Sequence, residues 1–370
     1  REAHSNSFNS ENRSMRLHVL VPLLVATVAA SKIPGTHNMM CKAKLQGKDS
    51  LEAKAPKTQF DVKFRETCVA ELFPRIPRAL TQTLRFGHVR VKDIYTTFTK
   101  INNMIGSGPS KLLTISDFDH TMSRAYDEKG ESCWTTHGIF EHTASMADLA
   151  VKLAALSAKY KPIEFNSSMT VEQKIPHMEA WWGESNDLIV AKGINRTLLE
   201  ELVQRSNVRM RDNAPALLKK LEDAHVPLIM FSAGIGDIIS VFFSQRLGAV
   251  PSNMHIVSNM MVFNNKDVVS GFKPPLIHSF NKNGKVVDKE TMSLMSKKEN
   301  VILMGDSMGD HHMIDGVKNH RGQDALKIGF LNKKDDLLKF YMDKYDIVIV
   351  DDQSMDVPRA IIDAVIGVRK

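Results

Sequence analysis

The sequence contains little cysteine, which narrows the kinds of site it can carry. Its three cysteines, Cys41, Cys68 and Cys133, are far apart, odd in number and form no C-x-x-C. This spacing argues against a disulfide framework and against a cysteine-ligated zinc site. We therefore expect unpaired cysteines, a pattern that favours a reducing compartment.

A hydrophobic run long enough to span a membrane is also missing. Residues 17–30 are apolar but include His18 and Pro22, and they fall short of the about 20 residues that a membrane-spanning helix needs. The basic start at Met15-Arg16 and the small residues at the end of the run are typical of a signal peptide. We expect a cytoplasmic protein, with membrane association or entry into the secretory pathway as the alternative if residues 17–30 are retained.

A clustered basic face is not expected on the larger part of the chain. The 370 residues have a formal net charge of +7. Residues 1–100 contain 17 Lys or Arg and 8 Asp or Glu, whereas the remainder contains 32 and 34. Because a nucleic-acid-binding domain needs a basic face, we expect no nucleic-acid partner. The 43% hydrophobic content is typical of a globular protein.

Two carboxylates follow a short apolar run at residues 112–116. The run is typical of a buried strand in a parallel sheet, and Asp117, Asp119 and Thr121 come directly after it. In open α/β sheets, ligands bind beyond the carboxyl ends of the strands. Two carboxylates crowded there repel each other unless a cation lies between them. A surface turn is the simpler alternative, because Asp is common in turns.

Apolar runs and helical patterns alternate over the second half of the chain. Strands are expected at 226–231, 255–257, 301–304, 326–330 and 346–350. Since helical patterns lie between most of these runs, the alternation predicts an α/β fold with a doubly wound parallel sheet.

The remaining segments complete the expected domain organisation. Residues 125–205 have helical periodicity, and we expect them to form an inserted helical cap above the carboxyl edge of the sheet. Residues 89–124 and 206–370 would form the core, and a helix is predicted from Val89 to Ile105. Residues 1–88 are polar or Lys-rich and are expected to form a disordered extension.

Polar residues also follow two further expected strands. Ser232 follows one of them and precedes glycines and a helix start, a setting that suits a phosphate. Asp306 and Asp310 follow another strand, around a glycine. Between these segments, Lys273 or Lys282 could neutralise a phosphate as a point charge. Each of these residues alone could also satisfy a turn, cap a helix or lie on the surface.

Together these residues resemble the motifs of the haloacid-dehalogenase superfamily of phosphatases: D-x-D-x-T, a Ser or Thr after the second strand, a Lys, and G-D-x-x-x-D. From Val89 to the C-terminus the chain is similar, more narrowly, to the cytosolic 5′-nucleotidase III family, also called pyrimidine 5′-nucleotidases. The segments that carry the resemblance are 116–124, 231–237 with its S-A-G-I-G-D run, 271–273, 276–278, 304–310, 326–332 and 341–348. The resemblance implies a Mg²⁺-dependent 5′-nucleotidase for pyrimidine nucleoside monophosphates such as CMP and UMP, with 7-methyl-GMP as a further candidate.

The resemblance also implies roles for the carboxylates. Asp117 would attack phosphorus and form an aspartyl-phosphate. Asp119 would protonate the leaving 5′-oxygen and then activate water. Mg²⁺ would bind Asp117, the backbone carbonyl of Asp119 and Asp306, with Asp310 and Thr121 as supporting residues.

The phosphate contacts follow from the same resemblance. Ser232, the Ala233 N–H and Lys282 would hold the phosphate oxygens. Lys282 is preferred to Lys273 because it matches the F-N-K position of the family.

Substrate contacts are expected from the helical insert. The resemblance assigns Glu164 to the base and Ser185 to the substrate. Trp134 and Trp181-Trp182 could stack on a base or fill the core of the cap. Two other functions stay open: a phosphatase for another small phosphate ester and a catalytically inactive interaction protein. The sequence does not predict the oligomeric state.

Overall fold

The computed structural model of the chain describes residues 41–42, 45, 67–320, 324–332 and 337–367. These residues fall into two compact units, the second of which includes the chain from Arg75 onward. In the first unit, Cys41 and Cys68 are joined by a disulfide, and their Cα atoms lie 5.2 Å apart. The expectation of unpaired cysteines was therefore wrong for this pair. Their sequence separation is 27, and only the folded chain brings them within bonding distance.

The N-terminal extension is described only in part. The apolar stretch 17–30 lies outside the described residues. Where the extension is described, residues 67–72 and α4 (Arg78–Thr83) are helical, which differs from the disorder expected for residues 1–88. Among the helices that the structure describes, none is both long enough and apolar enough to cross a membrane.

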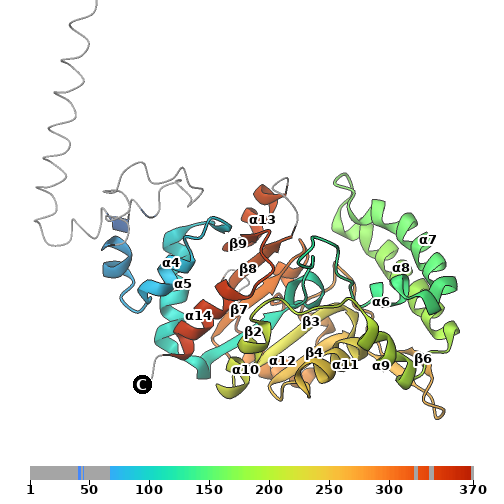
Figure 1. The fold of residues 1–370 in the computed structure, drawn as a ribbon. Coiled ribbons are helices and arrows are strands. Elements are labelled where there is room, and N and C mark those ends of the chain that lie inside the picture. Colours follow the sequence, from blue (N-terminus) through green and yellow to red (C-terminus); the bar gives the residue numbers. More distant parts are fainter. Residues whose placement is uncertain (1–40, 43–44, 46–66, 321–323, 333–336, 368–370) are drawn as a thin grey trace, which may run out of the picture. The chain divides into compact units, whose positions relative to one another are not determined.

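The second unit is built on a seven-stranded sheet in which six neighbouring strands run parallel (Figure 1). In sheet order the strands are β1 (Val89–Val91), β9 (Ile347–Val350), β8 (Leu326–Leu331), β7 (Asn300–Gly305), β2 (Leu112–Ser116), β3 (Leu228–Ile235) and β4 (Met254–Asn259). β1 pairs antiparallel with β9 at one edge of the sheet. A separate antiparallel pair is formed by β5 (Met261–Phe263) and β6 (Val269–Phe272). The expected α/β class is confirmed.

Strand β2 lies at the point where the strand order reverses. The chain leaves β2 for β3 and β4 on one side and returns to β7 on the other. All five residues of β2 are buried, and alternate residues Leu113 and Ile115 pack against Ile229 and Phe231 of β3 on one face. Asp117 is the next residue in this alternating series, and a reversal of strand order is where open α/β sheets bind ligands.

Helices surround the sheet and fill the chain between β2 and β3. Outside that insertion they are α4, α5 (Ile94–Ser107), α11 (Gly236–Leu247), α12 (Lys289–Ser296), α13 (Leu338–Lys344) and α14 (Asp356–Ile366). Between β2 and β3 they are η2 (Phe118–Met122), α6 (Gly138–His142), η3 (Ala144–Met146), α7 (Ala147–Glu164), α8 (Val171–Lys192), α9 (Arg196–Arg205) and α10 (Ala214–Asp223). Helices α7 and α8 pack side by side at one end of the sheet, shown in green in Figure 1.

Two elements differ from the sequence prediction. Residues Val89–Val91 form a strand, and the helix α5 begins only at Ile94, where the carboxylate of Asp93 accepts a hydrogen bond from the N–H of Thr96 at 2.5 Å. The strand exists because Val89–Val91 pairs with β9, a partner that local periodicity cannot reveal. Strand β3 is also longer than predicted and includes Ser232.

Candidate active site

A cavity of about 310 Å³ opens beyond the carboxyl ends of β2, β3 and β7. Eight of the residues predicted from the sequence line it: Asp117, Asp119, Ser185, Ser232, Ala233, Lys282, Asp306 and Asp310. Of the other candidates from the sequence, Trp181 and Trp182 line it, whereas Thr121, Glu164, Trp134 and Lys273 do not. The fold thus brings together side chains from five segments that are far apart in the sequence.

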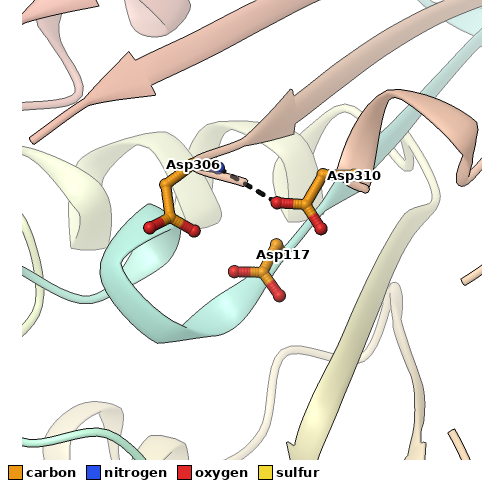
Figure 2. Close-up of side chains that lie close together, drawn as sticks. All are labelled: Asp117, Asp306 and Asp310. Atoms are coloured by element: carbon orange, nitrogen blue, oxygen red, sulfur yellow. Dashed lines mark hydrogen bonds between the residues drawn. The ribbon is translucent and has the colours of Figure 1, made fainter. Parts of the chain in front are cut away.

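Three carboxylates meet at the sheet end of this cavity. Asp117, Asp306 and Asp310 each place one oxygen within 4.8 Å of the others, and their side chains point toward one another in Figure 2. Asp117 is 5% exposed and Asp310 is 1% exposed. Three negative charges at this spacing, away from water, require positive charge between them.

Lys282 supplies part of that positive charge. Its Nζ lies 2.7 Å from Oδ1 of Asp117 and 2.5 Å from Oδ1 of Asp310. Burial lowers the pKa of Lys282, but the two neighbouring carboxylates outweigh burial and hold its pKa above the ordinary value. Lys282 therefore stays an ammonium and can act as a point charge in the cavity.

The negative charge of the three carboxylates is only partly neutralised by Lys282. Burial raises the pKa of Asp117 well above its ordinary range; Lys282 lowers this pKa, whereas Asp310 and Asp306 raise it further. Burial, followed by the charge of Asp310, raises the pKa of Asp306 to about 7. One ammonium group is thus insufficient to neutralise the charge of three carboxylates.

The three carboxylates fit a divalent cation. The ligand atoms that they offer are all carboxylate oxygens, the type that hard cations such as Mg²⁺ or Ca²⁺ prefer. A bound cation would also remove the repulsion that raises the pKa values of Asp117 and Asp306. We conclude that the cluster can hold a metal ion.

Asp306 is oriented by two neighbours. Oδ2 of Asp310 accepts hydrogen bonds from the N–H groups of Asp306 at 3.1 Å, the dashed line in Figure 2, and of Ser307 at 2.9 Å. The hydroxyl of Thr121 donates to Oδ1 of Asp306 at 3.2 Å. Thr121 therefore acts on the cluster from outside the cavity, as a supporting residue rather than a direct contact.

The carboxylate of Asp119 is held by Thr136, which the sequence reasoning missed. The Thr136 N–H donates to Oδ1 and the Thr136 hydroxyl donates to Oδ2, both at 2.8 Å. Thr136 is fully buried, so its two bonds fix the Asp119 side chain in one position. A lone threonine 17 residues after Asp119, outside any motif, offered no signal of this role.

Residues 232–234 face the cavity because the sheet is irregular there. The register of β3 against β4 shifts between Phe231 and Ile235. The Ser232 hydroxyl accepts from the Gly234 N–H at 3.0 Å. A Cβ on Gly234 would lie 2.2 Å from Oγ1 of Thr136 and 2.8 Å from Oδ2 of Asp119. Only glycine permits this close approach.

Two of the glutamates in the helical insert, Glu141 and Glu164, differ in their surroundings. Glu164 bonds to the hydroxyl of Ser279 at 2.5 Å, and Ser279, not Glu164, lines the cavity. Burial raises the pKa of Glu164, an effect that its bond to Ser279 partly offsets. Glu141, on α6, does line the cavity, and within the described part of the chain its carboxylate has no ion-pair partner. No motif in the sequence points to Glu141.

Tryptophan side chains also line the cavity. Trp182 is one of them, and its Nε1–H donates to the carbonyl of Ala233 at 2.9 Å, which fixes the indole beside Ala233. Trp181 lies against Trp182 with ring centroids 5.1 Å apart. Trp134 packs on His142 at 5.3 Å and does not line the cavity.

Comparison with known proteins identifies relatives over most of the chain. Residues 120–366 match the family described as pyrimidine 5′-nucleotidase (UMPH-1). The chain is 40% identical over 297 residues to putative cytosolic 5′-nucleotidase 3 of Caenorhabditis elegans, covering 78% of each protein. It is 38% identical over 266 residues to a human 7-methylguanosine phosphate-specific 5′-nucleotidase, covering 70% of this chain and 87% of the relative.

A solved structure agrees with these relatives. The crystal structure of cytosolic 5′-nucleotidase IIIB bound to cytidine matches with a TM-score of 0.71 and 31% identity. The match covers 77% of this chain and 95% of the other. The mostly parallel α/β sheet of this chain, with its acidic cluster at the carboxyl edge, is thus the fold of a solved 5′-nucleotidase. More narrowly, the chain belongs to the pyrimidine 5′-nucleotidase family, and it is a 5′-nucleotidase.

Replacing Thr136 tests whether its hydrogen bonds position the carboxylate of Asp119. Thr136→Val removes the hydroxyl bond but keeps the N–H bond, so we expect kcat on a nucleoside 5′-monophosphate to fall roughly 10-fold with little change in KM. Steady-state kinetics measures both values. Thr136→Ser retains the hydroxyl and should restore most of the activity. Wild-type kcat in Thr136→Val would contradict the role.

The raised pKa values predict how stability depends on pH and metal. Asp306 has a pKa of about 7 in the fold against 3.8 unperturbed, so between these values the folded state binds more protons than the unfolded state. The free energy of unfolding of the metal-free protein should therefore fall as pH rises through this window. Since a cation competes with these protons, we expect Mg²⁺ to raise Tm more at about pH 8 than at about pH 5.

Thermal unfolding with EDTA or Mg²⁺ measures this difference. Asp306→Asn should diminish it, because that variant lacks the titrating carboxylate. Equal Mg²⁺-induced shifts at both pH values in the wild type would contradict the assignment.

Proposed function

We propose that the protein hydrolyses nucleoside 5′-monophosphates in a Mg²⁺-dependent reaction through an aspartyl-phosphate on Asp117. The observation that carries this proposal is that Asp117, Asp119, Ser232, Lys282 and Asp306 line one cavity. A nucleophile, an acid, phosphate-binding groups and a metal-binding cluster are what such a hydrolysis requires.

The first half-reaction follows from the positions of the two aspartates. A carboxylate oxygen of Asp117 attacks phosphorus, and the bond from phosphorus to the nucleoside 5′-oxygen breaks with its electron pair on that oxygen. Asp119, held by Thr136, donates a proton to it, and the nucleoside leaves. Ser232, the Ala233 N–H and the ammonium of Lys282 hold the phosphate oxygens.

The second half-reaction returns the enzyme to its starting state. Asp119, now ionised, takes a proton from water as the water oxygen attacks the phosphorus of the aspartyl-phosphate. The bond to Asp117 breaks, and inorganic phosphate leaves. We assign Asp117, Asp306 and the Asp119 carbonyl as Mg²⁺ ligands; the charge neutralisation that Mg²⁺ supplies when bound lowers the repulsion between the Asp117 carboxylate and the phosphate.

A nucleoside base suits the part of the cavity that Trp182 lines. Trp182 lies beside Ala233, so a base attached to a phosphate held at Ser232 and Lys282 would meet the indole. Named relatives act on 7-methylguanosine phosphate, and a structural neighbour holds cytidine. We therefore propose CMP, UMP and 7-methyl-GMP as substrates, with Ser185 as a further substrate contact.

The domain organisation and location complete the proposal. Residues 125–205 would form a cap over the core of residues 89–124 and 206–370, excluding water from the phosphate. We propose a cytoplasmic location, as in the relative named cytosolic 5′-nucleotidase 3. Whether Glu164 contacts the base directly depends on its bond to Ser279 being exchanged for one to the substrate.

A substrate panel tests the reaction and its class of substrate. Phosphate release would be measured with CMP, UMP, 7-methyl-GMP, AMP and phosphoserine, each with Mg²⁺ and with EDTA. We expect turnover of the first three with Mg²⁺ only, and Asp117→Asn should lower it by on the order of 10⁴-fold while the protein stays folded. Preference for phosphoserine would support the alternative of another phosphate ester. Wild-type turnover by Asp117→Asn would exclude the aspartyl-phosphate.

Glu141, which has no ion-pair partner among the described residues, predicts a preference among bases. The 7-methylguanine ring carries a positive charge, whereas cytosine and uracil are neutral at neutral pH. Glu141→Gln should therefore lower kcat/KM for 7-methyl-GMP roughly 5-fold more than for CMP. Glu184→Gln is the matched control, since Glu184 pairs with Tyr160 and Lys159 and does not line the cavity. An equal loss for both substrates in Glu141→Gln would contradict this role.

A further inference from the structure

One buried cation of the protein lies outside the cavity and has no role in the reaction described above. Arg211 is 1% exposed. The residue before it, Met210, forms an antiparallel bridge with Ser123, which lies just after the catalytic aspartates. Its own N–H donates to the carbonyl of Met122 at 3.1 Å, so its side chain begins directly beside the turn η2. Burying a charged group is costly, and this cost calls for a specific reason.

The guanidinium of Arg211 binds the backbone of the catalytic turn. Its Nε donates to the carbonyl of Thr121 at 2.7 Å, and Nη2 donates to the carbonyl of His120 at 2.6 Å. Nη2 also donates to Oδ1 of Asn332 at 2.6 Å, and Nη1 donates to the carbonyl of Asp352. The guanidinium group therefore binds four oxygens from three separate segments at once. Among the side chains, only that of arginine has donors in this arrangement.

No carboxylate forms an ion pair with Arg211 among the described residues. All four acceptors are neutral oxygens, and the face of the guanidinium lies 4.2 Å from the ring centroid of Phe330. Burial lowers the pKa of Arg211 to about 10, with Asp306 the first of the charges that oppose this shift, so the side chain remains charged at neutral pH. Its charge thus strengthens hydrogen bonds to carbonyl groups.

The turn that Arg211 binds has an unfavourable backbone conformation. His120 has φ 61° and ψ 5°, the left-handed region that residues with a Cβ rarely adopt. Its N–H donates to the hydroxyl of Ser123 at 2.9 Å, and its carbonyl accepts from Arg211 and from Nδ2 of Asn332 at 2.9 Å. Both peptide groups of His120 are therefore fixed by side chains. Without them the turn could relax to a conformation of lower energy.

His120 lies between two residues of the site. Asp119 precedes it, with its carboxylate on Thr136, and Thr121 follows it, with its hydroxyl on Asp306. The conformation of His120 consequently sets how the acid–base group lies relative to the acidic cluster. A displacement of about 1 Å between such groups can cost on the order of 100-fold in rate.

We propose that Arg211 is a positioning residue of the 5′-nucleotidase reaction, which fixes the left-handed turn at His120 through the carbonyls of His120 and Thr121. Asn332 assists by holding both Arg211 and the His120 carbonyl. The inference rests on the proposed roles of Asp117 and Asp119. It adds that the geometry of the site depends on a buried arginine that contacts neither substrate nor metal.

The first test replaces the guanidinium group of Arg211 by an ammonium group and so keeps the positive charge. Arg211→Lys should lower kcat roughly 10- to 100-fold with KM changed less than about threefold, because the substrate contacts stay in place. Activity is expressed per folded enzyme, from circular dichroism and thermal unfolding. Arg124→Lys is the matched control, since Arg124 is 9% exposed and pairs with Glu128 and Asp212 instead of the turn. A kcat in Arg211→Lys within about twofold of the wild type would overturn the proposal.

The second test separates positioning from stability. In Asn332→Asp, the new carboxylate still accepts the hydrogen bond from Arg211 and turns that contact into an ion pair. The variant loses the Nδ2–H that donates to the His120 carbonyl, and it places a negative charge beside that carbonyl. A purely structural role of Arg211 predicts a stable enzyme with wild-type kcat, which would overturn the proposal even if Arg211→Lys fails to fold. We expect a stable enzyme whose kcat is roughly 10-fold lower.

Asp117→Asn separates this inference from the proposed function. If Asp117→Asn is inactive while Asn332→Asp has wild-type kcat, only the role of Arg211 is lost. If Asp117→Asn is active, the roles of the aspartates themselves are wrong.

Discussion

The crowding of three carboxylates around one ammonium is the constraint on which the rest of this structure depends. One oxygen each of Asp117, Asp306 and Asp310 lies within 4.8 Å of the others, Asp117 and Asp310 at buried positions and Asp306 at a half-buried one, and Lys282 offsets only part of their charge. In a medium of low polarity this arrangement is unfavourable for folding, which the raised pKa values of Asp117 and Asp306 express. It is favourable for a site that must receive a cation, because the binding of the cation relieves the repulsion.

Such a cluster persists only if the backbone around it is held in place. Polar side chains form hydrogen bonds to the backbone of these loops. Arg211 binds the turn after β2. Tyr341 and Tyr345 donate to the carbonyls of Asp306 and Ser307 after β7. These groups are buried, so breaking one bond leaves an unpaired polar group, which makes each loop costly to displace. The site is therefore supported by hydrogen bonds to its backbone as much as by the packing of the sheet.

The order of the strands explains why these segments meet. Because β2 lies between β3 and β7, residues at the carboxyl ends of all three strands face one cavity. The helical insertion follows β2 directly and contributes Trp182 and Glu141 to the lining of the same cavity. The carboxylate cluster thus comes from loops at the sheet edge, whereas aromatic side chains of the lining come from the inserted helices.

The sequence by itself determined the parallel α/β fold and most of the sheet side of the site. Apolar runs that end in Asp117, Ser232 and Asp306 carry their own signal, since a parallel sheet collects its carboxyl ends at one edge. The tertiary structure alone decided the strand Val89–Val91, the Cys41–Cys68 disulfide, the bonds from Thr136 to Asp119, and the contact of Arg211 with His120. It also showed that Glu141 lines the cavity, while Glu164 bonds to Ser279 instead. The physical reason is the same in each case: these contacts join residues far apart in the chain, through single side chains whose local sequence has no periodicity or motif to indicate a partner.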